Sequence, residues 1–312
     1  MSHFTVAVIT DGVPTKDKLA ETLMPWHEYE CTGFDNEYVV EVDETEKYRN
    51  YFEEYLIDSA HSTFEEYLID DGFREGPGGD YGFDKNEKGE ITRVYRRTNP
   101  NKKWDWWQVG GRWSGSLLTK SGSGFKGTPG LMGSQTDPNG SDQCAVTDLD
   151  CEGIRARNVE NRRRYLQEGL EELQEQHDIS REQAYALWDE YCSAMRALQA
   201  EWESYEKDGS FYGFIENHEL KDKVRGPIST FSFRVGLEYT DTDIDKWVEQ
   251  APSLTSYAVV VDGEWHEKGE MGWFGMSYND KDQADWNTEF EKLLAAKAED
   301  PNAWITMVDC HI

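Results

Sequence analysis

The apolar segments of this chain that are long enough to form a sheet core lie near its two ends. Residues 4–9 open the sequence, and residues 257–261 and 304–308 come close to its other end. Each segment is short, rich in β-branched residues and bounded by polar or turn residues, which is typical of a β-strand. Asp262 and Gly263 directly follow the second segment and predict a type I′ hairpin turn, because both central positions of that turn need a positive φ. A sheet that joins both ends of the chain is therefore the main constraint on its fold.

Residues 152–207 predict a helical hairpin. The second arm begins at Ser180, and Gln183 stands three residues later, so that the two side chains can form a capping box. Apolar residues then recur at helical spacing as far as Trp202. This segment is expected to fold as an insertion between the sheet-forming ends.

The whole chain is expected to adopt an α+β fold. A small mixed or antiparallel sheet is built from both chain ends, with helices around it and the helical hairpin inserted. At 312 residues the chain can bury one large core or two modest ones. We place one discontinuous α+β domain at residues 1–150 and 208–312, and the inserted helical hairpin at residues 151–207.

The chain is strongly acidic, with a net charge of −30. Residues 41–90 alone carry sixteen acids and five bases. A protein that wraps nucleic acid needs a basic face, so this composition argues against direct wrapping of nucleic acid. The charge serves solubility alone, reflects adaptation to high salt, which the undepleted lysine content disfavours, or forms a surface that competes for the basic face of a partner protein.

Cysteine usage and apolar runs indicate the compartment. The five cysteines are widely spread and include no Cys-x-x-Cys pair, which fits a reducing cytosol. The apolar runs are too short to span a bilayer, and the first residues lack the pattern of a signal peptide. We therefore expect a cytoplasmic protein without a membrane partner.

Residues 91–114 form a basic, aromatic island in this acidic chain. They hold six cationic residues, one acid and four tryptophans. Tryptophan faces can stack on a base, while Arg112 and the amides of the Gly-Gly step can receive phosphate oxygens. The alternative is a buried aromatic cluster held by an ion pair between Asp105 and Arg112 and by a glycine turn. The candidate ligand-binding residues are Trp104, Asp105, Trp106, Trp107, Gly110, Gly111, Arg112, Trp113, Arg96 and Lys103.

A second candidate site follows the predicted hairpin turn. His266 could titrate near neutral pH, and Glu267 or Glu270 could orient it or act as a base. The alternative is a return strand that carries an exposed histidine and ordinary surface charges. Because the sequence contains no Walker loop, nucleophile elbow, zincin helix or dinucleotide fingerprint, a binding protein is favoured over an enzyme.

Four residues have the chemistry of a mixed zinc site. His27 and Cys31 stand four residues apart, the spacing that puts two ligands on one helix face, and Cys310 and His311 end the last predicted strand. Pro25 makes a continuous helix through His27 doubtful. Adjacent strand residues also point to opposite faces. We therefore predict neither a metal ion nor another cofactor.

Three sequence strings resemble a family of uncharacterised proteins carried by tailed bacteriophages. They are KWDWWQVGGRW at residues 103–113, WHEKGEMGWFG at residues 265–275 and VDCHI at residues 308–312. The resemblance implies a phage origin and, with it, the cytoplasm of an infected bacterial host. It implies little chemistry, because no activity is established for that family.

Two functions are consistent with these features. The first is a phage accessory protein that acts by binding: its acidic surface would block a basic host protein, such as a nuclease or another defence factor. The second is a nucleotide-binding protein that sequesters or hydrolyses its ligand at the island of residues 91–114. Either protein could be oligomeric.

Overall fold

The computed structural model describes the chain except residues 1, 56–60, 130–139, 205–209 and 273–276. The chain folds into two compact units. The first unit comprises Met1–Leu149 and Ser256–Ile312, and the second comprises Asp150–Thr255.

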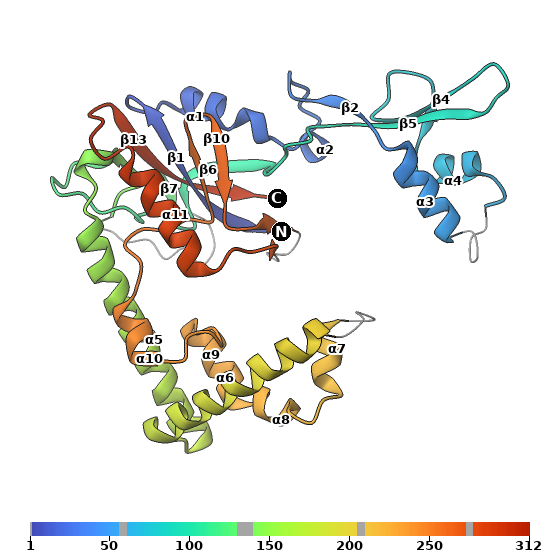
Figure 1. Cartoon of the computed structure of the whole chain (residues 1–312). Coiled ribbons are helices and arrows are strands. Elements are labelled where there is room, and N and C mark those ends of the chain that lie inside the picture. The colour runs from blue at the N-terminus through green and yellow to red at the C-terminus, as the bar shows by residue number, and fades with distance from the viewer. Residues whose placement is uncertain (1, 56–60, 130–139, 205–209, 273–276) are drawn as a thin grey trace. The chain divides into compact units, whose positions relative to one another are not determined.

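The first unit is organised around a mixed sheet in which both chain ends take part (Figure 1). The strand order is β10-β9-β1-β13-β6-β7, and β8 also pairs with β13. The strand β1 is antiparallel to β13 and parallel to β9. These strands are β1 (His3–Asp11), β6 (Trp106–Gly111), β7 (Thr128–Pro129), β8 (Gln143–Ala145), β9 (Ala258–Val261), β10 (Glu264–Glu267) and β13 (Ala303–His311). The α+β fold predicted from the sequence is confirmed, although β6, β7 and β8 from the middle of the chain enlarge the sheet.

Both faces of this sheet are covered. On one face, Val6 and Val308 pack against Leu19 and Leu23 of α1 (Lys16–Leu23). On the other face the alternate strand residues are also buried, among them Met307, which is 1% exposed. The remaining short elements of this unit are η1 (Met24–Trp26), α2 (Tyr29–Thr32), η2 (Val146–Asp148), β11 (Glu270–Met271), β12 (Ser277–Tyr278) and α11 (Gln283–Ala295).

A smaller four-stranded sheet forms part of the same unit, with the order β2-β5-β4-β3. Its core contains Leu68, Phe73, Phe83 and Val94. Thr63 and Glu66 form a capping box at the start of α4, so that this short helix begins at a defined residue. The elements are β2 (Val40–Asp43), α3 (Thr45–Tyr55), α4 (Phe64–Asp70), β3 (Arg74–Glu75), β4 (Tyr81–Lys85) and β5 (Ile91–Thr98).

The second unit is helical and larger than the predicted hairpin. Its elements are α5 (Cys151–His177), α6 (Arg181–Ser204), α7 (Phe211–Glu216), α8 (Lys221–Val224), α9 (Pro227–Val235) and α10 (Ile244–Glu249). Phe231 and Trp247 share one core with Leu173 and Trp188 of the hairpin. The inserted unit therefore ends at Thr255 and not at residue 207, because the helices after the hairpin cover its apolar face.

None of the helices that the structure describes combines the length and the apolar character needed to cross a membrane.

Candidate functional site

The four tryptophans of the island have different environments. Trp104 is 4% exposed, and its Nε1 donates to the carbonyl oxygen of Leu23 at 3.1 Å. Trp107 packs against the apolar core on the α1 side, whereas Trp106 is 44% exposed. Trp113 is partly exposed, just beyond β6. The tryptophans therefore do not form one stacking surface, because strand alternation sends Trp106 and Trp107 to opposite faces.

Most of the positive charge of the island is neutralised by acids that are distant in the sequence. Lys102 contacts Glu28 and Glu30 at 2.9 and 2.8 Å, and Lys103 contacts Glu267 at 2.5 Å. The three arginines of β5 form the ion pairs Arg93–Glu41, Arg96–Glu44 and Arg97–Asp35. Among the six cations only Arg112 makes no ion pair with an acid in the described part of the chain. The basic island of the sequence is thus not a basic patch on the surface.

Two carboxylates of the protein itself fill the space beside the Gly-Gly step. Gly110 and Gly111 have φ values of +80° and +53°. A Cβ atom at Gly111 would lie 2.3 Å from atoms of Asp309, and one at Gly110 would lie 2.6 Å from Oδ2 of Asp142. The backbone amide of Arg112 donates to Oδ2 of Asp309 at 2.9 Å. The sequence suggested that the glycines let an external anion approach the backbone. In the structure, the missing Cβ atoms instead make room for two carboxylates of the protein itself.

One interpretation of the sequence paired Asp105 with Arg112, but Asp105 contacts a histidine in the structure. Its Oδ1 lies 2.6 Å from Nδ1 of His311. In the same way, Oδ1 of Asp309 lies 2.8 Å from Nδ1 of His3. His3 and His311 stand directly opposite each other on β1 and β13, and their ring centroids are 5.1 Å apart. The fold thus brings together two imidazole–carboxylate pairs.

This histidine pair extends to Trp106 on the next strand. The exposed ring of Trp106 meets the ring of His3 edge to face at 6.1 Å between centroids. Nε2 of His311 is buried, and no hydrogen-bond partner for it lies in the described part of the chain. His3 was not among the site residues predicted from the sequence, because only the register of β1 on β13 places it opposite His311. Both residues lie at strand ends, which is the one signal that the sequence offered.

The four candidate metal ligands that the sequence offered, His27, Cys31, Cys310 and His311, do not converge on one point. Cys310 is wholly buried in the core on the α1 side, on the face of β13 opposite to His311. The Nε2 atom of His27 lies 3.1 Å from the hydroxyl of Thr32, and burial lowers the pKa of His27. Cys31 and His311 each have a potential ligand atom close to the carboxylate of Asp105.

Cys31 belongs to a different group of potential ligands. One atom each of Glu28, Cys31 and Asp105 lie within 4.8 Å of one another. A hydrogen bond to Glu28, together with burial, raises the pKa of the Cys31 thiol to about 11. The thiol is therefore protonated near neutral pH, and Glu28 also accepts a hydrogen bond from Lys102 at 2.9 Å.

The second candidate site lies on the return strand of the hairpin, as its alternative interpretation stated. His266 faces Glu264 and Glu289 at 3.5 and 3.9 Å. Glu267 binds Lys103 instead, and Glu270 accepts a hydrogen bond from Asn279 at 3.0 Å. Glu267 and Glu270 line a hollow of about 290 Å³ together with Lys102 and Lys103. His266 does not line this hollow. Neither glutamate orients the histidine.

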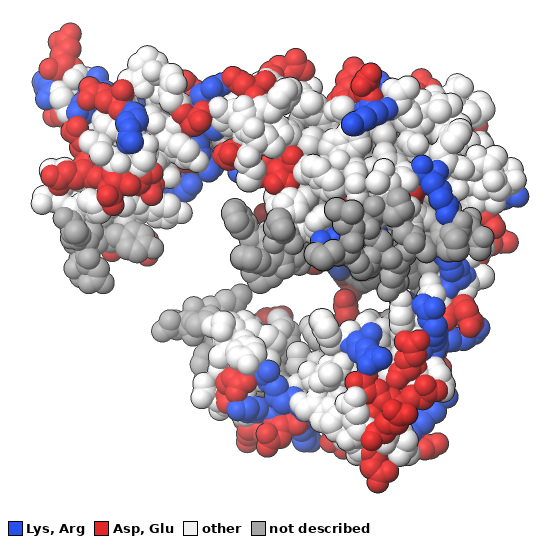
Figure 2. Space-filling model, turned by 180° about the vertical axis from the view of Figure 1, so that it is seen from behind, with Lys and Arg blue, Asp and Glu red and all other residues white. Residues whose placement is uncertain are grey.

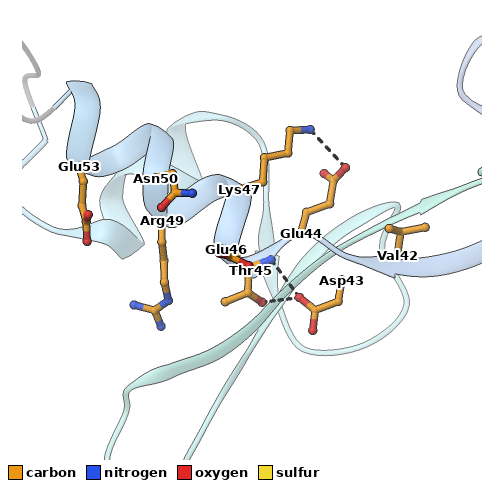
Figure 3. A pocket seen from close by; sticks show the side chains of 9 residues that line it. All are labelled: Val42, Asp43, Glu44, Thr45, Glu46, Lys47, Arg49, Asn50 and Glu53. Carbon is orange, nitrogen blue, oxygen red and sulfur yellow. Dashed lines mark hydrogen bonds and ion pairs between the residues drawn. The ribbon is translucent and has the colours of Figure 1, made fainter.

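The acidic stretch of residues 41–90 contains an open hollow of about 940 Å³ between β2 and α3 (Figure 3). In Figure 3 the side chains of Asp43, Arg49 and Glu53 point to one side of the ribbon, whereas Lys47 and Glu44 pair on its other side at 3.2 Å. The nine lining residues include four acids and two bases. The hollow is therefore acidic in balance.

The same stretch of the chain carries exposed acids without a cationic partner among the described residues, and two of them, Glu46 and Glu53, line the hollow. Glu46, Glu53, Glu54 and Asp71 are exposed and make no ion pair with a cation in the described ranges. In the face seen in Figure 2, acidic side chains form scattered patches with basic side chains among them.

Comparison with protein-family models gave no match, and comparisons with curated proteins and with solved structures gave none either.

Proposed function

We propose that the protein acts by binding a basic partner protein through the exposed acids of residues 41–71. The observation that carries the proposal is the acidic hollow between β2 and α3, together with Glu53, Glu54 and Asp71 of the same segment, which form no ion pair within the described ranges. In the phage setting that the sequence motifs suggest, the partner is a basic host protein such as a nuclease or another defence factor. The proposed place of action is the cytoplasm of the infected bacterium.

Charge complementarity supplies the physical basis. The 62 acids outnumber the 32 basic residues, so about half of the acids are left over even if every cation forms an ion pair. Such an excess attracts a cationic partner over distances of roughly 8–10 Å at physiological salt and accelerates its association. Binding would block the basic face that the partner uses for nucleic acid.

The test compares two triple charge reversals in the full chain. Glu53→Lys, Glu54→Lys and Asp71→Lys together should abolish the salt-sensitive capture of a basic protein from a bacterial host lysate. The control reverses three exposed acids elsewhere, Glu175, Asp189 and Glu299, and changes the net charge equally. Capture that survives the first set of reversals, or that both sets weaken equally, would contradict the proposal.

A second candidate function is nucleotide binding at Trp106, and one specific observation favours it. Trp106 is the exposed tryptophan of β6, and Arg112, the cation of the island without an ion pair in the described structure, follows two residues after Gly110. The amide of Arg112 binds Asp309, which in turn binds His3, the ring neighbour of Trp106. In this second candidate, a base stacks on Trp106 and Arg112 supplies the cation for its phosphate.

Thermal unfolding with added nucleotides tests this candidate. A ligand present at 100 times its Kd adds about 2.7 kcal/mol of stability, which raises the unfolding midpoint visibly. The increase should vanish in Trp106→Ala and in Arg112→Ala but persist in Phe125→Ala, which removes another exposed aromatic ring. An unchanged midpoint for the wild type with every nucleotide would reject the candidate.

A further inference from the structure

Two carboxylates beside the histidine pair lack a permanent cationic partner. Asp309 is 1% exposed and contacts His3 and the amide of Arg112. The side chain of Asp105 is 15% exposed and contacts His311. Neither makes an ion pair with a lysine or arginine among the residues that the structure describes. Charge that is withdrawn from water in this way needs compensation by a cation or a proton.

The hydrogen bonds determine which ring nitrogens are available. An ionised carboxylate can only accept, so Nδ1 of His3 and Nδ1 of His311 carry the hydrogens in the two contacts. In a neutral ring, Nε2 then presents a lone pair. Nε2 of His311 is buried and has no hydrogen-bond partner among the residues that the structure describes. Protonation of this Nε2 atom would leave a buried N–H group without a hydrogen-bond acceptor. A metal ion that binds the Nε2 lone pair would satisfy this nitrogen better.

We propose that His3 and His311 bind one divalent transition-metal ion, such as Zn²⁺, through their Nε2 atoms, while Asp309 and Asp105 hold the two rings. Metal-bound histidines typically donate their second ring N–H to a carboxylate, which is the arrangement of both pairs here. Two imidazoles on one tetrahedral ion have ring centroids roughly 5 Å apart, since each Zn–N bond is about 2.0–2.1 Å. The observed separation is 5.1 Å.

The ion would also compensate the two carboxylate charges, and the remaining coordination positions would be taken by water or by a small ligand. Imidazole donors select zinc and its neighbours over magnesium or calcium. The inference is independent of the proposed binding of a basic partner, because none of the acids of residues 41–71 contributes to this site.

The group of Glu28, Cys31 and Asp105 is the competing location. Its donors are already satisfied, since Glu28 binds Lys102 and the thiol of Cys31 binds Glu28. A metal ion would have to displace a thiol proton whose pKa is about 11. The orphaned Nε2 of His311 has no such competitor, so the histidine pair is the better site.

The experiment titrates Zn²⁺ into the chelator-treated, untagged full chain by calorimetry. We expect one bound ion, with at least tenfold weaker binding in His3→Gln and in His311→Gln. Cys31→Ser and His218→Gln serve as controls and should bind as the wild type does, since His218 belongs to the second unit, where its ring nitrogens contact Glu201 and the amide of Leu220. Circular dichroism confirms that each variant is folded.

Two further measurements separate ligands from positioning residues. Asp309→Asn should weaken Zn²⁺ binding by about 10–100-fold, the usual effect of losing a carboxylate behind a metal-bound histidine. X-ray absorption of the zinc-loaded wild type should show nitrogen and oxygen neighbours, including imidazole, and no sulfur at about 2.3 Å. A sulfur neighbour, unaltered affinity in both histidine variants, or no binding by the wild type would each overturn the proposal.

Discussion

Nδ1 of His311 lies 2.6 Å from Oδ1 of Asp105, and this contact connects the end of β13 to the beginning of the Trp-rich strand β6. The same two strands pair from Val308 opposite Val109 to His311 opposite Trp106. Two sequence motifs that lie about 200 residues apart therefore form one local structure. The contact also uses the acid that one of the two interpretations of the sequence paired with Arg112.

Trp104 and Trp106 should respond very differently to removal of their rings. Trp104 is 4% exposed and hydrogen-bonded to Leu23, so Trp104→Ala is expected to lower the free energy of unfolding by about 3–5 kcal/mol. Trp106 is 44% exposed, and Trp106→Ala should cost less than about 1 kcal/mol. Urea unfolding of both variants checks the difference, and equal losses would be incompatible with this structure.

Gly111 should tolerate no side chain. Alanine at this position faces both a positive φ of +53° and a Cβ contact of 2.3 Å with Asp309. Gly122 is the matched control, because its φ is +72° and its Cβ position is open. Gly122→Ala should lower the free energy of unfolding by about 1–2 kcal/mol, because alanine is strained in the left-handed backbone conformation. Gly111→Ala should lower it by about 1–3 kcal/mol more, because its Cβ atom also clashes with Asp309. Thermal unfolding of the pair measures this excess, which would be zero if Asp309 did not approach the turn.

Cys31 should react slowly with alkylating reagents although it is exposed. The hydrogen bond to Glu28 and burial raise its pKa from 9.0 to about 11, which lowers the thiolate fraction near pH 8 about 100-fold. Glu28→Gln should therefore accelerate alkylation, and mass spectrometry can follow the modification of this residue. Alkylation as fast as that of an unstructured cysteine peptide would show that the contact with Glu28 does not form.

Glu30 should make stability depend on acid pH. Burial by itself would raise the pKa of Glu30, but hydrogen bonds from Lys102 and Thr98 outweigh it and lower the pKa below 4.5. A carboxyl group with a lowered folded-state pKa contributes stability that is complete above the unfolded-state pKa and is lost as pH falls through the folded-state value.

Near neutral pH, Glu30→Gln should therefore be less stable than the wild type by up to about 3 kcal/mol, which is typical of hydrogen bonds to charged groups. The difference should shrink as the pH falls below about 4.5. Thermal unfolding of the two proteins across this range provides the measurement. A difference that stays constant with pH would mean that the Glu30 contacts are not formed.

Features that depend on neighbouring residues could be predicted from the sequence. Asp262 and Gly263 have φ values of +54° and +79°, as the predicted type I′ turn requires, and β10 returns along β9. The capping box at the start of α6 is also confirmed, because Ser180 and Gln183 exchange the two expected hydrogen bonds. Turn and cap preferences act within a few residues, so the surrounding fold does not override them here.

The charge of the island could not be predicted in the same way. Its residues were counted along the chain, but Lys103 pairs with Glu267 and Arg93 pairs with Glu41. The strand pairing of β5 with β2 determines the second contact. A local excess of cations therefore says little about the surface until the partners of each cation are known.

The sequence by itself determined the class of fold, the sheet built from both chain ends, the hairpin turn and the acidic character, because these follow from local periodicity and composition. The tertiary structure alone decided the extent of the inserted unit, the neutralisation of the basic island and the pairing of His3 with His311. Each of these depends on strand register or on packing between distant segments. Such contacts form because they bury the core of the whole unit, and the residues of one segment alone do not determine how that core is assembled.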